Sequence, residues 1–230
     1  MAATRKLSLV VLASLLGLVA CGGSTKKVDP AADLALAKQA VLVAADLPGY
    51  TGTPHSSSDD IPASVKKTFA DCMKVPTTIF DDTPGAQKAD SPDFAKGEAQ
   101  ISNSIEIDPK QSDIDDGFKQ ISKPGTEPCL QKFFEAAITT GASGTQGVTF
   151  GNAAVTRFDV GVGKKSVAYT LKISASAGGN TALFYIDLVF VPRDRAGLEF
   201  DFFNLGTPTD RTLLKSLVQK VYDRVGDGAK

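Results

Sequence analysis

The sequence predicts an α+β fold: an antiparallel sheet of about five or six strands packed with helices, with the C-terminal helix on the sheet. Three observations support this fold class. Apolar residues at helical spacing dominate the first half, strict alternation marks residues 99–107, and the last third contains strands joined by short polar turns. The chain of 230 residues is long enough for one such domain after a short leader.

Two helices are expected first. Residues 33–47 carry apolar side chains near helical spacing, and Pro48 with Gly49 should end that helix. Residues 61–73 form the second, with Pro62 in its first turn and one apolar face made by Val65, Phe69 and Cys72. The acidic, turn-rich stretch 76–92 is expected to be irregular.

The first strand signal covers residues 99–107, where buried and polar positions alternate until Pro109. A short polar helix is expected over 113–121. A longer one is expected over 127–140, because its apolar residues share one side and Gly141 follows its end.

The last third is expected to be mostly strand. It comprises a strand pair or one bent strand, followed by three single strands, at 148–160, 167–174, 183–191 and 198–205. The turns at 177–180 and 193–195 are short, so these strands should pair in antiparallel fashion.

The chain should end in an amphipathic helix. Thr207, Pro208, Thr209 and Asp210 resemble a capping box with proline at the first helical position. The buried stripe of this helix should consist of Leu214, Leu217, Val218, Val221 and Val225.

The N-terminus resembles the leader of a bacterial lipoprotein. Arg5 and Lys6 precede an apolar run of about 14 residues, whereas a membrane-spanning helix needs about 20. The run ends in Leu18-Val19-Ala20-Cys21, which resembles a lipobox, in which the cysteine thiol is acylated before cleavage. The alternatives are a transmembrane anchor, for which the run is short, and a secretory signal with an incidental cysteine.

We therefore predict a signal peptide over residues 1–20, a lipidated Cys21 opening a flexible tether over 21–30, and a single globular domain over 31–230. The acyl chains would hold the domain at the outer face of the cytoplasmic membrane, so the membrane is an expected partner.

The two remaining cysteines, Cys72 and Cys129, are expected to form a disulfide, because disulfides persist outside the cytoplasm. The alternative is two separate buried thiols. A metal site is disfavoured, since the sequence has no CxxC and its one histidine, His55, has no neighbouring thiol or imidazole.

Several function classes lack their motifs. The formal net charge is −1 with acids and bases interspersed, which argues against nucleic acid as a partner. No G-x-S-x-G occurs, and residues 161–165 are glycine-rich without the spacing of a phosphate-binding loop. We expect no cofactor, no metal and no catalytic residue.

A candidate ligand surface involves the strand at 183–191, which is apolar on both faces. Its core face is expected to be Phe184, Ile186, Leu188 and Phe190, next to Leu198, Phe200 and Phe202 of the following strand. The opposite faces would then combine into one surface, with Glu199 at its side and with the candidate ligand-binding residues Tyr185, Asp187, Asp201 and Phe203. The alternatives are a covering helix and acid–base catalysis by the carboxylates.

The mature chain resembles actinobacterial extracytoplasmic lipoproteins and, more distantly, the extracellular sensor domains of mycobacterial receptor serine/threonine kinases. The resemblance is carried by Ala44-Ala45-Asp46-Leu47-Pro48-Gly49, by Cys72 and Cys129 in successive helices, and by the serine-bearing strand 101–107. It implies a domain with a ligand cleft. Such sensor domains have two disulfides, whereas only one can form here, and no kinase domain is present.

The leading hypothesis is a non-enzymatic, membrane-tethered binding or sensor-like domain for an envelope lipid, peptide, small molecule or partner protein. The alternatives are a cell-envelope hydrolase and a purely structural or interaction lipoprotein without a pocket. An apolar cavity would favour binding, and a sheet fully covered by helices would favour the structural role. A cleft with converging carboxylates of strongly shifted pKa would favour the hydrolase.

Overall fold

The computed structural model describes residues 28–55, 61–141 and 148–230. The predicted signal peptide, the lipidation site Cys21 and the tether up to residue 27 lie outside these ranges. The described chain is an α+β domain with five α-helices and a nine-stranded antiparallel sheet. This confirms the predicted fold class and corrects the predicted strand number of five or six.

The sheet has the order β1-β3-β4-β9-β8-β7-β5, with β2 also paired to β4 and β6 also paired to β7. Its long strands are β4 (Ala99–Ile107), β7 (Val167–Ala177), β8 (Asn180–Arg193) and β9 (Ala196–Leu205). The short ones are β1 (Thr51–Thr53), β2 (Gln87–Asp90), β3 (Asp93–Lys96), β5 (Val148–Phe150) and β6 (Ala154–Phe158). The first three were not predicted, because strands of three or four residues show too few alternations.

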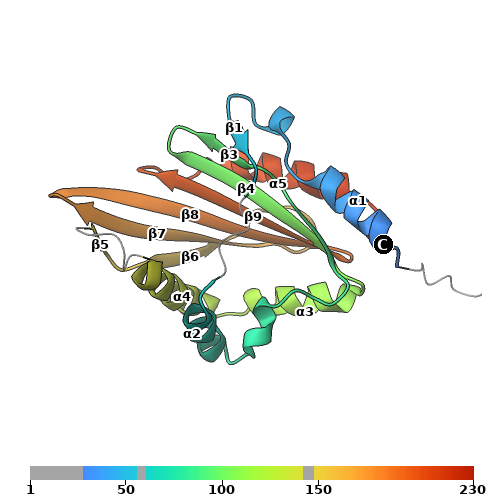
Figure 1. The fold of residues 1–230 in the computed structure, drawn as a ribbon, viewed down its shortest axis with the longest axis horizontal. Coiled ribbons are helices and arrows are strands. Elements are labelled where there is room, and N and C mark those ends of the chain that lie inside the picture. The colour runs from blue at the N-terminus through green and yellow to red at the C-terminus, as the bar shows by residue number, and fades with distance from the viewer. Residues whose placement is uncertain (1–27, 56–60, 142–147) are drawn as a thin grey trace, which may run out of the picture.

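Helices cover the sheet on both sides (Figure 1). One layer contains α1 (Pro30–Ala40) and α5 (Arg211–Val225), and we call the sheet side beneath it the closed face. The other layer contains α2 (Ala63–Met73), α3 (Gln111–Ile121) and α4 (Thr126–Gly141), and we call that side the open face. Two short 3-10 helices complete the fold, η1 (Ala44–Asp46) and η2 (Thr77–Phe80).

Two helix boundaries differ from the prediction. The first helix ends at Ala40, because the backbone amide of the buried Leu42 leaves the helical path and donates to Oδ1 of Asn103 in β4 at 2.8 Å. The last helix begins after Asp210, whose carboxylate accepts from the amides of Thr212 and Leu213. Pro208 therefore precedes the helix, and the predicted capping box with proline at the first helical position is wrong.

The larger core lies on the closed face. The central strands contribute fully buried side chains, among them Ile105, Val189 and Phe200. The predicted stripe of α5 packs against them, with Leu214, Leu217, Val218, Val221 and Val225 all buried. Burial of this contiguous apolar surface is the main source of stability, and it confirms that the C-terminal helix lies on the sheet.

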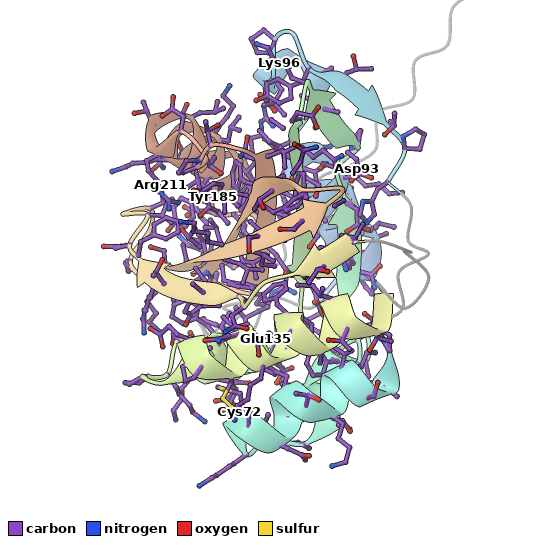
Figure 2. All side chains as sticks on the ribbon, turned by 90° about the vertical axis from the view of Figure 1, so that its left-hand side faces the viewer. Cys72, Asp93, Lys96, Glu135, Tyr185 and Arg211 are labelled. Carbon is purple, nitrogen blue, oxygen red and sulfur yellow. A yellow bond between two sulfur atoms is a disulfide. The ribbon has the colours of Figure 1, made fainter. Side chains whose placement is uncertain are left out.

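The open face is covered mainly over β6 and β7. Tyr169 of β7 is buried and donates from its hydroxyl to the carbonyl of Ile121 at 2.5 Å. The predicted disulfide between Cys72 and Cys129 is present and ties α2 to α4 (Figure 2). Beside it, Phe69, Phe80 and Phe133 pack with ring centroids 5.7–6.2 Å apart. These helices form a second, smaller core.

The β8–β9 hairpin has a different register from the predicted one. Arg193 pairs directly with Ala196, which leaves a two-residue turn in which Asp194 adopts a φ of 52°. A three-residue turn would have paired even-numbered with even-numbered residues. The shorter turn places Val189 and Val191 on the closed face with Phe200, and it moves Phe184, Ile186, Leu188 and Phe190 to the open face.

Candidate functional site

A cleft of about 520 Å³ opens on the open face between α3, the η2 segment and strands β2, β4, β8 and β9. Whereas α4 packs over β6, α3 contacts β8 and β9 near their connecting turn and forms one wall of the cleft there. Apolar side chains line one part of the cleft, namely Ile79, Ile114, Phe118, Ile121 and Phe190. A concave site with an apolar wall is the usual form of a ligand pocket.

Two glutamates stand on the cleft floor. Glu199 of β9 lies opposite Ser104 of β4, and Glu106 of β4 lies opposite Lys88 of β2. Glu199 is exposed to solvent and lines the cleft, where the surrounding protein still removes part of the water around its carboxyl. This partial desolvation, together with the charge of Asp201 two residues away, raises the pKa of Glu199 to about 7.

Asp108 follows β4 at the end of the cleft and is only 3% exposed. Among the residues that the structure describes, its Oδ1 atom has no hydrogen-bond partner. Burial and, to a smaller extent, the charge of Glu106 raise the pKa of Asp108 to about 7. A buried carboxylate without a cation is costly, and the raised pKa reflects this cost, because the group takes up a proton more readily than an ordinary aspartate.

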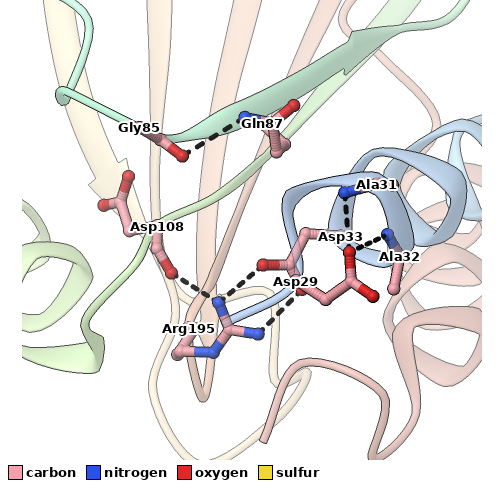
Figure 3. A network of polar contacts seen from close by, with 8 residues as sticks. All are labelled: Asp29, Ala31, Ala32, Asp33, Gly85, Gln87, Asp108 and Arg195. Carbon is pink, nitrogen blue, oxygen red and sulfur yellow. Dashed lines mark hydrogen bonds and ion pairs between the residues drawn. The ribbon is translucent and has the colours of Figure 1, made fainter. Parts of the chain in front are cut away.

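The nearest arginine does not neutralise Asp108 (Figure 3). Arg195 of the β8–β9 turn donates to the backbone carbonyl of Asp108 at 2.8 Å, but its guanidinium forms a bidentate pair with Asp33 of α1 at 2.8 and 2.9 Å. Figure 3 shows that the carboxyl of Asp108 points away from this guanidinium. The positive charge beside the cleft end is therefore already committed to another acid.

The four predicted ligand-binding residues do not form one surface. Tyr185 and Asp187 face the closed side, where Asp187 is fully buried, accepts from Thr170 Oγ1 at 2.5 Å and pairs with Arg211 at 3.1 Å. Figure 2 places Tyr185 and Arg211 on the side of the sheet away from α4. Asp201 and Phe203 face the open side, next to Leu188 and Ile186.

The four residues are divided between the two faces because of the register of the β8–β9 hairpin. The covering helix that was the alternative for this surface is present, because α5 packs over β8 and supplies Arg211. None of the four residues lines the cleft. Asp201 comes nearest, because it lies two residues from Glu199 on the open face: desolvation raises the pKa of Asp201 to about 6, and its charge raises the pKa of Glu199.

Most cleft residues were not singled out from the sequence, Glu106, Asp108 and Phe118 among them. One usable signal was present, because the alternating pattern of residues 99–107 puts Glu106 on the polar face with Ser102 and Ser104. A second was the density of acids between residues 106 and 116. What could not be seen was that β2 and η2 fold over this segment.

Within residues 28–55, 61–141 and 148–230, no group of three or more histidine, cysteine or acidic side chains could hold a metal ion. Over the same ranges, no helix has the length and apolar character needed to cross a bilayer.

No protein-family model matches the chain, and no curated protein matches it. Several solved structures are similar, among them the following two. The crystal structure of the extracellular domain of PknH from Mycobacterium tuberculosis has 10% identity and a TM-score of 0.46, covering 87% of this chain and 97% of that one. A protein of unknown function, PA94 from Pseudomonas aeruginosa, has 16% identity and a TM-score of 0.18, with 67% and 82% covered.

Proposed function

We propose that this chain is a lipid-anchored, extracytoplasmic and non-enzymatic binding domain whose ligand occupies the cleft between α3, η2 and the open face. The observation that carries the proposal is the cleft itself, which combines an apolar wall with carboxyl groups such as Asp108 that have no cation of their own. A site of this composition is satisfied by a bound molecule and is otherwise a cost to the fold.

Two further features support the extracytoplasmic part of the proposal. The Cys72–Cys129 disulfide fits an oxidising compartment. The predicted tether would join the described domain at α1, which belongs to the layer on the closed face. A lipid anchor there would attach on the side of the sheet opposite the cleft, so the anchored domain would keep its cleft accessible.

The binding role is tested by filling the cleft. Gly117 of α3 lines it, and a Cβ atom added at this position would meet nothing within 4 Å, so a larger side chain can enter the cleft. We expect native mass spectrometry of the protein purified from its own host to detect a co-purifying small molecule, and Gly117→Trp to lose it. Ser112→Trp is the matched control, because Ser112 is exposed on the same helix and outside the cleft. A wild type without bound molecule, or the same occupancy in Gly117→Trp, contradicts the proposal.

The anchor is tested separately. The intact mass of the membrane form should include a diacylglycerol on Cys21 and lack residues 1–20, and Cys21→Ala should move the protein out of the membrane fraction. Full partition of Cys21→Ala with membranes would refute the tether.

A second candidate, a cell-envelope hydrolase, is favoured by one observation. The pKa values of Glu199 and Asp108, both near 7, suit a general acid at neutral pH. If this candidate holds, isolated envelope incubated with the wild type should release soluble fragments, whereas Glu199→Gln should release none. Equal release by both proteins would remove it.

A further inference from the structure

The cleft is strongly and unusually acidic for this molecule, whose formal net charge is only −1. Among the described residues that line it, one lysine, Lys88, stands against six acids: Asp81, Glu106, Asp108, Asp113, Asp116 and Glu199. Lys88 also lies 3.8 Å from Asp90, outside the cleft. Such an excess of one charge, on low-dielectric walls, concentrates ions of the opposite sign.

Other buried acids of the domain have cations from the fold. Asp33 pairs with Arg195 at 2.8 Å, Asp46 pairs with Arg224 at 2.5 Å, and Asp187 pairs with Arg211 at 3.1 Å. Asp108 is buried to a similar degree, yet no ion pair reaches its carboxyl among the described residues. Its Oδ1 atom, like Oδ2 of Asp187, has no hydrogen-bond partner there. The side chain of Thr83 hydrogen-bonds to the carboxyl of Asp108, but the Oδ1 atom has no partner and the described residues supply no cation to this carboxyl.

The rest of the cleft restricts what that cation can be. Ile114 and Phe118 of α3 and Phe190 of β8 form an apolar wall beside the acids. A small hydrated ion gains nothing from such a wall, whereas an organic molecule buries apolar surface there. The acids themselves do not converge into a group that could hold a metal ion within the described ranges.

We infer that the cleft binds an organic cation, an amine or guanidinium group carried on an apolar body. The cationic group lies at the acidic end, beside Asp108, and the apolar body lies along Ile114 and Phe118. This inference rests on the proposed function, because it takes the cleft as the ligand site, and it adds the chemical class of the ligand. The same chemistry is offered by a free alkylamine and by a lysine side chain in a peptide.

The inference is tested by isothermal titration calorimetry with n-octylamine as the probe and with n-octanol and octanoate as neutral and anionic probes of the same length. We expect n-octylamine to bind at least about tenfold more tightly than n-octanol, and octanoate not to bind. The tripeptide acetyl-Leu-Lys-Leu-amide, compared with acetyl-Leu-Gln-Leu-amide, distinguishes the two sources. Tighter binding of the lysine peptide than of n-octylamine assigns the cation to a peptide, and the reverse order assigns it to a free amine.

Charge-neutral variants locate the interaction. Asp108→Asn and Glu199→Gln should each weaken n-octylamine binding by about five- to tenfold, because a charge-assisted contact is lost. The matched control is Asp115→Asn, which removes the same charge from α3 outside the cleft, where Asp115 pairs with Lys165 at 3.2 Å. It should change the affinity by less than about twofold. Thermal melting of each variant confirms that it is folded.

The remaining outcomes separate this inference from the proposed function. Equal binding of n-octylamine and n-octanol, abolished for both by Gly117→Trp, keeps the cleft as a binding site and overturns the cationic ligand. An n-octylamine affinity that Asp108→Asn, Glu199→Gln and Asp115→Asn reduce equally also overturns it, because the effect is then one of overall charge. No binding of any amine probe overturns it as well, whereas the proposed function is then judged by the co-purifying molecule.

Discussion

The two faces of the sheet differ in whether a buried acid has a cation from the described chain. On the closed face, Asp187 is fully buried and is paired with Arg211 and Thr170. On the open face, Glu199 has Asp201 as its neighbour, and Asp108 at the end of the strand has an unpartnered oxygen. On the closed face Asp187 has a cation from the chain, although its Oδ2 atom and Nδ2 of Asn103 lack a hydrogen-bond partner among the described residues, whereas Asp108 at the open face has no cation.

The pKa directions follow the same division. At Asp46, in the layer on the closed face, burial acts to raise the pKa, but hydrogen bonds from Arg224 and from the amide of Val43 outweigh it and the pKa is lowered. At Asp108, burial and the charge of Glu106 act together and raise the pKa to about 7. At Asp46 the hydrogen bonds therefore outweigh desolvation, whereas at Asp108 the hydrogen bond with Thr83 does not, and uncompensated desolvation of this size is typical of functional sites.

The largest expected effect sharpens this comparison with a pair of phenylalanines on β9. Phe200 is fully buried in the closed-face core, whereas Phe203 is half-buried on the open face, 5.7 Å from the ring of Phe184. Phe200→Ala should lower the free energy of unfolding by about 4 kcal/mol, because it leaves a cavity in a packed core. Phe203→Ala should cost about 1 kcal/mol. Urea unfolding measures both, and equal losses would contradict the difference between the two faces.

The second effect concerns the helices on the open face. The disulfide joins residues separated by 57 positions, and removing it frees the unfolded chain. The double variant Cys72→Ala/Cys129→Ala should lose about 3–4 kcal/mol of stability. Because the bond ties α2 to α4, hydrogen exchange should increase in these helices more than in α5. An equal increase in α5 would show that the two layers do not unfold separately.

Much of this fold could be read from the sequence, because its signals are local. The alternation of residues 99–107 and 167–174 fixed which segments are strands, and the stripe of Leu214 to Val225 marked the helix that covers them. The disulfide could also be predicted, since only two cysteines follow the predicted lipidation site Cys21. The end of α1 could not be predicted from the local sequence. It depends on the hydrogen bond between Leu42 and Asn103, which are 61 residues apart in the chain.

The candidate site was less accessible, because it depends on register and on tertiary packing. The turn at Asp194 has one residue less than predicted, and this exchanges the two faces of β8. Tyr185 and Asp187 therefore lie on the opposite face from Asp201 and Phe203. The cleft also needs the short strand β2, whose four residues show no clear pattern. Local sequence also does not indicate that Arg195 pairs with Asp33 and not with Asp108, and this pairing leaves Asp108 without a cation.

The third effect concerns the ion pair between Arg195 and Asp33. Arg195→Ala leaves Asp33, which is 5% exposed, without its cation, and it removes the donor to the Asp108 carbonyl. We expect a loss of about 2–3 kcal/mol in the free energy of unfolding at neutral pH. Arg157→Ala is the control, because its guanidinium is exposed and donates only to the carbonyl of Ser122. A loss no larger than that of the control would show that the Arg195–Asp33 pair contributes little.

The smallest effect is an expected gain in the free energy of unfolding, and it concerns Asp108, which lies beside the Arg195–Asp33 pair. Because its pKa in the folded protein, about 7, lies above the value of 3.8 for an ordinary aspartate, ionisation costs more in the folded than in the unfolded state. The contribution of Asp108 to stability is therefore fully present below about pH 4 and is lost as the pH rises toward about 7. Asp108→Asn cannot ionise and should escape this loss.

We expect Asp108→Asn to match the wild type near pH 4 and to be more stable by about 1–2 kcal/mol near pH 8. The gain is smaller than the full shift implies, because Glu106 and Asp113 contribute to that shift and their effect depends on their own ionisation. Urea unfolding at both pH values measures it, with Asp115→Asn as the control. A less stable Asp108→Asn near pH 8 would mean that the carboxylate is already partnered in the folded protein. A more stable variant that also binds n-octylamine less tightly would show that the open face retains a destabilising charge for its ligand.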